Sequence, residues 1–301
     1  FEDRLVNRTD DGFDGSLIGA LEEDEQPVWL DGATAWAPDA TLYFLRYAPE
    51  PGVEYEDRNQ TPLALYRLNP AVDTPPEFVA DMTGQLPYIS VYDDSDMQLD
   101  GNMAMAPDAE QIAFNVTSLD PDAPNNGIYV MNIKDADSLR QIAMLEDFRA
   151  GFLADADPDA RIILAGLGWN ADSTALYVLA TQPTDRWNLG RIIARVDVES
   201  GDVTTLTDLS DVDPATAFDL ETDPALGFPQ RWLVPDVAIM APARDGVIYA
   251  ARTPERSAVM ALGPDDLRVM LEFDDSLNFW IGSVEFEGNA TALLGGYLLE
   301  R

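Results

Sequence analysis

The sequence predicts an all-β fold: a single five-bladed β-propeller built from four-stranded antiparallel blades. Three observations support this prediction. One short motif recurs five times, apolar residues alternate with the period of two that strands require, and Gly or Pro interrupts nearly every segment that a long helix would need. Apolar residues make up 46% of the 301 residues and charged residues 24%, so the chain has ample material for a core.

The recurring motif is a large apolar residue followed by turn-forming residues. Its copies are W-A-P-D at 36–39, M-A-P-D at 105–108, W-N-A-D at 169–172, M-A-P-A at 240–243 and a degraded F-E-G-N at 286–289. Pro presets the φ angle of the first turn position, and Asp accepts hydrogen bonds from the backbone that follows it. A short β-rich run comes after each copy, at 42–47, 111–116, 175–179, 247–250 and 290–294. Each unit is therefore expected to open with a β-hairpin.

A second hairpin follows in the first four units. Its inner strands are expected at 63–68, 128–133, 191–198 and 258–262, and its outer strands at 77–82, 139–145, 203–209 and 267–273. The last apolar residue of the outer strand recurs at intervals of 61 to 64 residues, at Leu21, Met82, Leu145, Leu209 and Phe273. Four antiparallel strands in each repeat define a propeller blade.

The fifth unit holds only two of these strands before the chain ends, and two short apolar segments, 4–7 and 16–21, precede the first motif. We therefore expect N-terminal strands to complete the C-terminal blade and close the ring. The blades then span approximately residues 22–82, 83–145, 146–209, 210–273, and 274–301 together with 1–21. This interpretation predicts that residues 1–301 form one propeller domain.

The composition excludes several classes of function. The chain carries 55 acidic and 18 basic residues, a net charge of −37, whereas nucleic-acid binding needs a basic surface. The absence of Cys and His excludes disulfides, cysteine nucleophiles, imidazole metal ligands and a Ser–His–Asp triad. No apolar run approaches the roughly 20 residues that span a bilayer, so no membrane span is expected.

The first residue, Phe1, indicates an extracytoplasmic protein, periplasmic or extracellular, whose signal peptide has been removed; trimming of the chain is the alternative. The acidity fits a protein kept soluble at high ionic strength, and a genome that encodes Arg in place of Lys explains the composition equally well. The Asn-X-Ser/Thr sequons at Asn7, Asn59, Asn115 and Asn289 accept glycans only in a source that glycosylates.

The repeat resembles that of the TolB-type propeller family. The likeness rests on W-A-P-D at 36–39 with Phe44 and L-Y-R-L at 65–68, and on M-A-P-D at 105–108 with I-A-F at 112–114 and I-Y-V-M-N at 128–132. The chain departs from the family where Gly usually follows Pro-Asp, because Ala40 and Ala109 stand there. The resemblance is clear in three units and weaker in two. It implies a propeller fold and, with far less specificity, bacterial extracytoplasmic proteins that bind other proteins or carry a peptidase domain.

Blade topology places the second-to-third-strand connections and the blade-to-blade connections on one face, and these are long: 22–33, 48–62, 83–102, 118–126, 146–164, 181–189 and 210–236. They hold 27 acidic residues and five arginines. Long loops on a rigid scaffold commonly carry binding sites. The predicted binding face comprises Tyr88, Tyr92, Asp94, Asp96, Trp187 and Trp232. The alternative is that the loop aromatics, which also include Trp29, Tyr55, Phe148, Phe152, Phe218 and Phe228, cap the core.

Asp155, Asp157 and Asp159 alternate within one loop and are candidate ligands for Ca²⁺, which takes several oxygen ligands. The EF-hand pattern is absent, because no Gly stands at the sixth position and no Glu at the twelfth. The alternative is loop charge solvated by water. No other cofactor is expected.

Two classes of function follow from these residues. The first is a non-catalytic, exported protein-binding or scaffold module that meets a protein partner, within a larger assembly, through its acidic and aromatic long-loop face. The second is a carboxylate-dependent, glycosidase-like hydrolase with acids at the central channel. Such an enzyme needs two carboxyl groups about 5–9.5 Å apart, at least one of them desolvated. Five-bladed glycosidases carry an F-R-D-P motif, which F-R-A-G at 148–151 matches poorly, and we therefore favour the first class.

Overall fold

Strands make up most of the regular structure of the protein. The computed structural model describes residues 30–47, 63–72, 74–83, 86, 103–116, 126–153, 159, 162–182, 190–212, 225–240, 245–253, 256–263, 266–274, 278–287 and 291–299. Two short 3₁₀ helices, η3 (Leu145–Gly151) and η4 (Gln230–Leu233), lie between strands. Within these residues, no helix is long and apolar enough to cross a membrane.

The described strands form five antiparallel sheets, which we number in chain order. Sheet 1 contains β1 (Leu30–Trp36), β2 (Leu42–Tyr47), β3 (Leu63–Leu68) and β4 (Glu77–Asp81), and sheet 2 contains β5 (Met103–Met105), β6 (Gln111–Val116), β7 (Gly127–Asn132) and β8 (Asp135–Met144). Sheet 3 contains β9 (Ile163–Trp169), β10 (Ala175–Thr181), β11 (Arg191–Asp197) and β12 (Val203–Thr205). Sheet 4 contains β13 (Val237–Met240), β14 (Val247–Arg252), β15 (Arg256–Leu262) and β16 (Leu267–Asp274), and sheet 5 contains β17 (Asn278–Glu287) and β18 (Thr291–Leu299).

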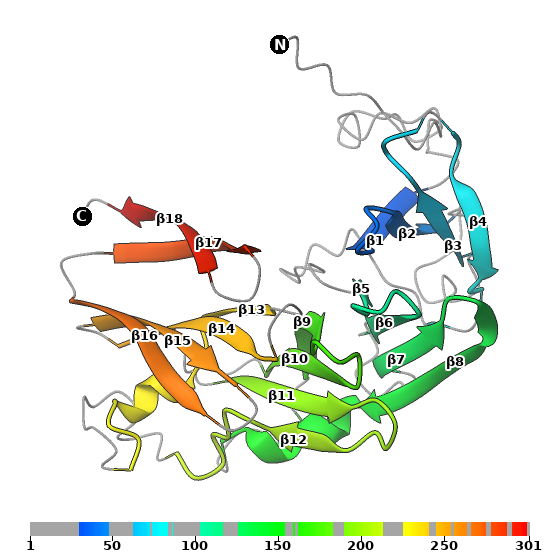
Figure 1. Ribbon diagram of the computed structural model, residues 1–301. Helices are drawn as coiled ribbons and strands as arrows, with labels where there is room; N and C mark the ends of the chain where they lie inside the picture. Colours follow the sequence, from blue (N-terminus) through cyan, green and yellow to red (C-terminus); the bar gives the residue numbers. More distant parts are fainter. Residues whose placement is uncertain are drawn as a thin grey trace, which may run out of the picture.

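Within sheets 1 to 4, the strands lie in chain order and each runs antiparallel to the next. The first strands of successive sheets, β1, β5, β9, β13 and β17, are neighbours in that order. The sheets therefore follow one another around an arc, with β1–β4 at one end and β17–β18 at the other (Figure 1). The expected all-β architecture of four-stranded antiparallel sheets is confirmed for sheets 1 to 4, and their arrangement is propeller-like.

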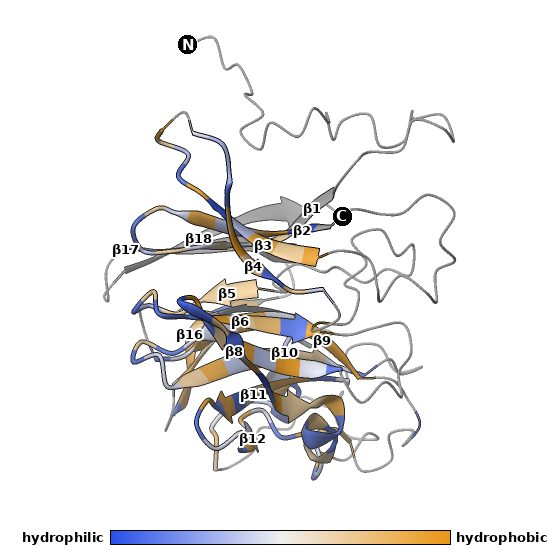
Figure 2. Cartoon of the chain, turned by 90° about the vertical axis from the view of Figure 1, so that its right-hand side faces the viewer, coloured by the Kyte–Doolittle hydropathy of each residue, from blue (hydrophilic) through white to orange (hydrophobic). Residues whose placement is uncertain are grey.

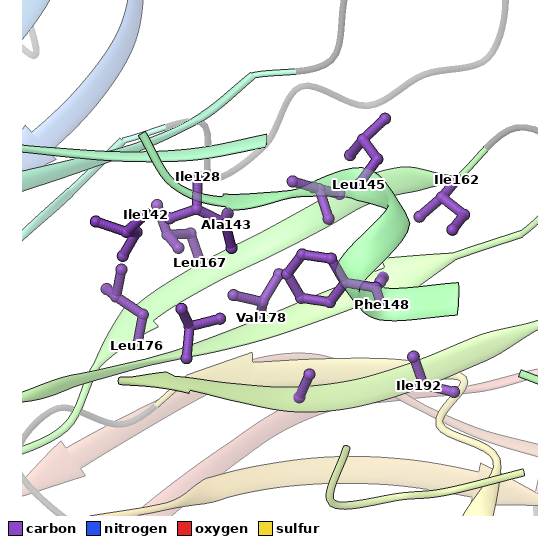
Figure 3. Close-up of a cluster of buried hydrophobic side chains, with 14 of the residues drawn as sticks. Ile128, Ile142, Ala143, Leu145, Phe148, Ile162, Leu167, Leu176, Val178 and Ile192 are labelled. Atoms are coloured by element: carbon purple, nitrogen blue, oxygen red, sulfur yellow. The ribbon is translucent and has the colours of Figure 1, made fainter. Parts of the chain in front are cut away.

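Three apolar clusters lie between neighbouring sheets, because sheets 2 and 3 turn buried side chains to both of their neighbours. The strands carry most of the hydrophobic residues, and the hairpin turns are largely hydrophilic (Figure 2). The cluster between sheets 2 and 3 brings Ile128 and Ile142 together with Leu176 and Val178 (Figure 3). Sheets 1 and 2 share the cluster that contains Leu45, Leu65, Ile112 and Phe114, and sheets 3 and 4 share the cluster that contains Tyr177, Ile193, Tyr249 and Met260.

The recurring motif forms the turn between the first and second strands of sheets 1 to 3. The Asp39 carboxylate accepts a hydrogen bond from the Thr41 N–H at 3.0 Å, and Asp108 closes the equivalent turn of sheet 2. The residue after each Asp has a positive φ, 64° at Ala40 and 59° at Ala109. These turns therefore place an alanine in the left-handed conformation that glycine adopts most easily. The conformation costs about 1–2 kcal/mol at each alanine.

Side-chain hydrogen bonds join sheets 2 and 3 along their shared seam. The indole N–H of Trp169, at the last position of β9, donates to the Ala104 carbonyl of β5 at 2.9 Å. At the neighbouring turns, the N–H of Asp108 donates to the Ser173 hydroxyl at 3.3 Å. The motif residue of sheet 3 thus contacts the preceding sheet, and the short turns of the two sheets lie on the same side.

Candidate binding face

Long connections join the strands at one end of sheets 1 to 3, which we call the long-connection end. They are residues 48–62 and 82–102 around sheet 1, 117–126 and 145–162 around sheet 2, and 182–190 and 206–236 around sheet 3. The hairpins at the opposite, short-turn end include 37–41, 106–110, 133–134 and 170–174. The corresponding connections of sheet 4 are short: residues 253–255 join β14 to β15, and residues 275–277 join β16 to β17. The strand ends that these long connections join therefore lie on one side of three neighbouring sheets.

Of the six residues predicted for the binding face, the structure describes only Trp232. Its side chain is 1% exposed and stacks on Phe228 with ring centroids 6.2 Å apart. The Tyr249 hydroxyl donates to the Trp232 carbonyl at 2.9 Å, which ties η4 to sheet 4. Trp232 is therefore a core residue between sheets 3 and 4, and its assignment to an exposed binding face was wrong. The other five, Tyr88, Tyr92, Asp94, Asp96 and Trp187, lie outside the described residues.

The described aromatic residues of the long connections all cap the core, as the alternative interpretation held. Phe148, on η3, is fully buried and points into the cluster between sheets 2 and 3, towards Val178 (Figure 3). Phe152, just after η3, is 3% exposed. The backbone here lies so close to β12 that a Cβ on Gly151 would meet the Thr205 hydroxyl at 2.4 Å. These segments thus form a rigid base beneath the long-connection end.

A buried arginine lies at the base of this end, between sheets 3 and 4. Arg231, on η4, is 3% exposed; its burial lowers the pKa of the guanidinium, while nearby Asp236 opposes that shift. Arg191, at the start of β11, donates to the Asp236 carbonyl. Two guanidinium groups and one carboxylate therefore lie together, and guanidinium donors suit carboxylate or carbonyl oxygens. Sequence reasoning missed both arginines, because Arg231 has the pattern of an exposed loop residue and Arg191 that of an ordinary strand end.

Asn115 is a polar residue buried in the seam between sheets 2 and 3. It is 2% exposed, and its side-chain amide donates to the Leu164 carbonyl at 3.2 Å. Its Oδ1 atom is buried and has no hydrogen-bond partner. The sequon at this residue is therefore inaccessible to glycosylation, whereas Asn7, Asn59 and Asn289 lie outside the described residues.

The loop with the alternating aspartates is described only at Asp159, which is exposed in a turn. Asp155 and Asp157 lie outside the described residues, so Ca²⁺ binding by these three side chains stays a prediction. In the part of the chain that the structure describes, no group of three or more His, Cys, Asp or Glu side chains is arranged to hold a metal ion.

The described carboxyl groups with a shifted pKa are Asp39, Asp81 and Asp197, and all three shifts are downward. The Thr41 backbone N–H lowers the pKa of Asp39 by hydrogen bonding, and the Ser200 N–H does the same for Asp197. A general acid needs the opposite shift, produced by desolvation. These three carboxylates accept hydrogen bonds within turns, and their lowered pKa values give no support to the hydrolase hypothesis.

A second feature is the face of sheet 1 that turns away from sheet 2, which we call the outer face of sheet 1. The rings of Phe44 and Tyr66 stack with centroids 5.9 Å apart, and Phe78 meets Tyr66 edge to face at 5.8 Å. Phe44 is fully buried beneath this face. The Arg46 guanidinium lies 5.0 Å from the Tyr66 ring centroid. Phe78 is 54% exposed, and Trp36 at the end of β1 is 58% exposed. This apolar face was not predicted, because the residues come together only through strand register.

No protein-family description matches this chain, and no curated protein sequence matches it. Among solved structures, it is similar to an acylaminoacyl peptidase from Pyrococcus horikoshii, at 11% identity over 84% of this chain, with a TM-score of 0.42. It is also similar to dipeptidyl peptidase 4 from Porphyromonas gingivalis, at 10% identity over 93%, with a TM-score of 0.47. A third is polysaccharide lyase Uly1, at 11% over 85%, with a TM-score of 0.40.

The chain spans 33% of the acylaminoacyl peptidase, 39% of the dipeptidyl peptidase and 52% of the lyase. Similarity at this level of identity assigns no activity, substrate or site residue to this chain.

Proposed function

We propose that the chain forms a closed five-bladed propeller that acts as a non-catalytic binding or scaffold module for a basic protein partner. The observation that carries the binding role is the gathering of the long connections at one end of sheets 1 to 3. Such connections on a rigid frame are free to vary without disturbing the core, which is why binding sites commonly use them.

The proposed ring has sheets 1 to 5 as its blades, with sheet 5 completed by strands from residues 1–21. Two features support it. Sheet 5 has two described strands where the other sheets have four, and the segments 4–7 and 16–21 are short and apolar, as the two further strands would be. Removal of residues 1–20 is expected to expose a strand edge and cause self-association, which size-exclusion chromatography detects. A truncated chain that stays a stable monomer contradicts this closure.

The chemistry of the long connections favours a basic partner. They hold 27 acidic residues and five arginines, and opposite charge on a partner steers its approach. Beneath them, Phe148, Phe152, Phe228 and Trp232 are buried, so a partner meets a base that is already ordered. Little conformational entropy is then lost from this base on binding.

Association kinetics test this function. Proteins retained by the immobilised chain from its native extract at low and high salt are identified, and their binding is then measured with purified components. Replacing Asp94 and Asp96 by Asn is expected to slow association severalfold at low salt and leave dissociation nearly unchanged. The matched control replaces Asp137 and Asp172, two exposed acids near the short-turn end, by Asn. Equal slowing in both variants contradicts a localised binding face.

The rival account treats the acidity as adaptation to salt. It predicts that the melting temperature climbs steadily with ionic strength, because screening weakens self-repulsion, and that no protein is retained at any salt concentration. That pair of results would end the binding proposal.

We also propose that the protein acts outside the cytoplasm, and fractionation of source cells tests this location.

A further inference from the structure

In sheets 1 to 3, the first residue of the motif ends the first strand, and its position in the strand sets the direction of its side chain. Trp36, Met105 and Trp169 each end the first strand of their sheet and pair with Leu42, Ile112 and Leu176, respectively, on the second strand. Trp169 lies in the cluster shared with sheet 2, and Met105 lies in the cluster shared with sheet 1. The motif residue therefore packs against the preceding sheet in both cases.

Trp36 occupies this position in sheet 1 with the opposite exposure. It is 58% exposed, whereas Trp169 is 1% exposed and Met105 is 8% exposed. Phe44 and Tyr66 lie on the same face as Trp36, because Phe44 is two residues from Leu42 along β2 and pairs with Tyr66 on β3. The whole outer face of sheet 1 thus has the orientation of a seam, and the sheet that precedes it around a closed ring is sheet 5.

Sheet 5 has the register and the space to cover this face. Phe286 pairs with Ala292, so it corresponds to Trp36, and Glu285 corresponds to Ala104, whose carbonyl accepts the Trp169 indole N–H. The same register aligns Gly295 with Leu45, which packs towards sheet 2, the next sheet in the chain. A glycine at that position leaves room for the Tyr66 and Arg46 side chains, which are half-buried on this face.

We propose that the outer face of sheet 1 is the docking surface for sheet 5, and that the Trp36 indole N–H donates to the Glu285 carbonyl across this seam. The proposal rests on the five-bladed ring proposed above and names the contacts that close it. The occupant is a segment of this chain, β17–β18. The exposed rings of Trp36 and Phe78, together with the half-buried ring of Tyr66, then supply the apolar area that holds the ring shut.

Indole hydrogen exchange tests the contact. The chain is labelled with ¹⁵N-tryptophan, the Trp36→Phe and Trp169→Phe variants identify the two indole resonances, and exchange into D₂O is followed by NMR without any partner. Protection of the Trp36 indole by at least about tenfold over free indole, as for Trp169, is the expected result. Exchange of Trp36 at the rate of free indole, with Trp169 still protected, would falsify the contact.

A leucine in place of Gly295 provides a second test of the seam. Gly295→Leu is expected to raise the Trp36 exchange rate by about tenfold and leave Trp169 unchanged, since local opening exposes one seam only. The control, Gly296→Leu, changes the next residue, on the other face of the sheet, and is expected to affect Trp36 less. Equal effects of the two variants overturn the role of Gly295, and the wild-type exchange decides the contact if Gly295→Leu does not fold. The exchange experiment contains no binding partner, so it tests the seam alone. If the Trp36 indole is protected but the chain retains no protein partner, the binding role is wrong and the seam contact stands.

Discussion

The seam between sheets 2 and 3 and the outer face of sheet 1 place the same repeat position in opposite surroundings. Trp169 is 1% exposed and its indole N–H is bonded to Ala104, whereas Trp36 is 58% exposed. Both side chains end the first strand of a sheet. The comparison teaches that the repeat sets the direction of the tryptophan, and that a preceding sheet is needed to bury it.

The largest effect expected from this comparison is at Trp169. Trp169→Ala removes a fully buried ring from the core between sheets 2 and 3, and we expect it to lower the free energy of unfolding by about 3–5 kcal/mol. Chemical denaturation measures the loss. In a closed ring, Trp36→Ala costs at least about 2 kcal/mol, whereas a tryptophan left exposed costs within about 0.5 kcal/mol. A small effect at Trp36 together with a large one at Trp169 argues for an open arc.

A second prediction separates the two buried indoles. The Trp232 Nε1 atom is buried without a hydrogen-bond partner, while that of Trp169 is bonded. Trp169→Phe removes a buried hydrogen bond and is expected to cost about 1 kcal/mol more than Trp232→Phe, which removes a desolvated donor. Denaturation curves of the two variants give the difference. The reverse order would show that the Trp232 indole has a partner in solution.

The motif turns provide a third, stabilising prediction. Ala40 and Ala109 have positive φ, so Ala40→Gly and Ala109→Gly are each expected to raise the free energy of unfolding by about 0.5–1 kcal/mol. Ala71, an exposed turn residue without positive φ, serves as the control, and its replacement by Gly is expected to destabilise through chain entropy. Thermal melts rank the three variants. Destabilisation by Ala40→Gly contradicts the turn conformation.

The smallest effect concerns the turn cap Asp197. Hydrogen bonds from Ser200 and Glu199 lower the pKa of its carboxyl in the folded protein. The stabilisation is therefore present above the ordinary Asp pKa of about 3.9 and is lost as the pH falls through the folded value. Wild type is expected to exceed Asp197→Asn in stability above pH ~4, with the difference shrinking as the pH falls towards the lowered folded pKa and vanishing below that value. Urea unfolding across pH, with Asp172→Asn as the charge-matched control, measures this; a difference that persists at low pH contradicts it.

Much of the fold could be predicted from the sequence, because each strand pattern is local. The expected segments 42–47, 63–68 and 111–116 coincide with β2, β3 and β6. The outer strands are less regular: β8 begins at Asp135, where its expected segment began at 139, and β12 ends at Thr205 instead of 209. Outer strands bury only part of one face, so their apolar alternation is weaker and their ends are poorly marked.

The candidate site was less predictable, since burial depends on tertiary contacts. An aromatic residue in a long loop looks the same in sequence whether it faces solvent or caps a core, which is why Trp232 was assigned to the surface. The buried Arg231 and Asn115 had no local signal, because polar residues are mostly exposed. The outer face of sheet 1 depends on the pairing of β2, β3 and β4, which the sequence does not specify residue by residue.

The distance between the motif turns of sheets 1 and 5 tests the central claim most directly. The chain lacks Cys, so nitroxide labels can be placed on cysteine pairs at will. The reference pairs are Asp39 with Asp108 and Asp108 with Asp172, the turns of neighbouring sheets, and Asp39 with Asp172 reports the next separation. A closed five-bladed ring predicts that the pair Asp39 and Asn289 gives the distance of neighbouring sheets in double electron–electron resonance. A distance beyond that of Asp39 and Asp172 would contradict the closed ring.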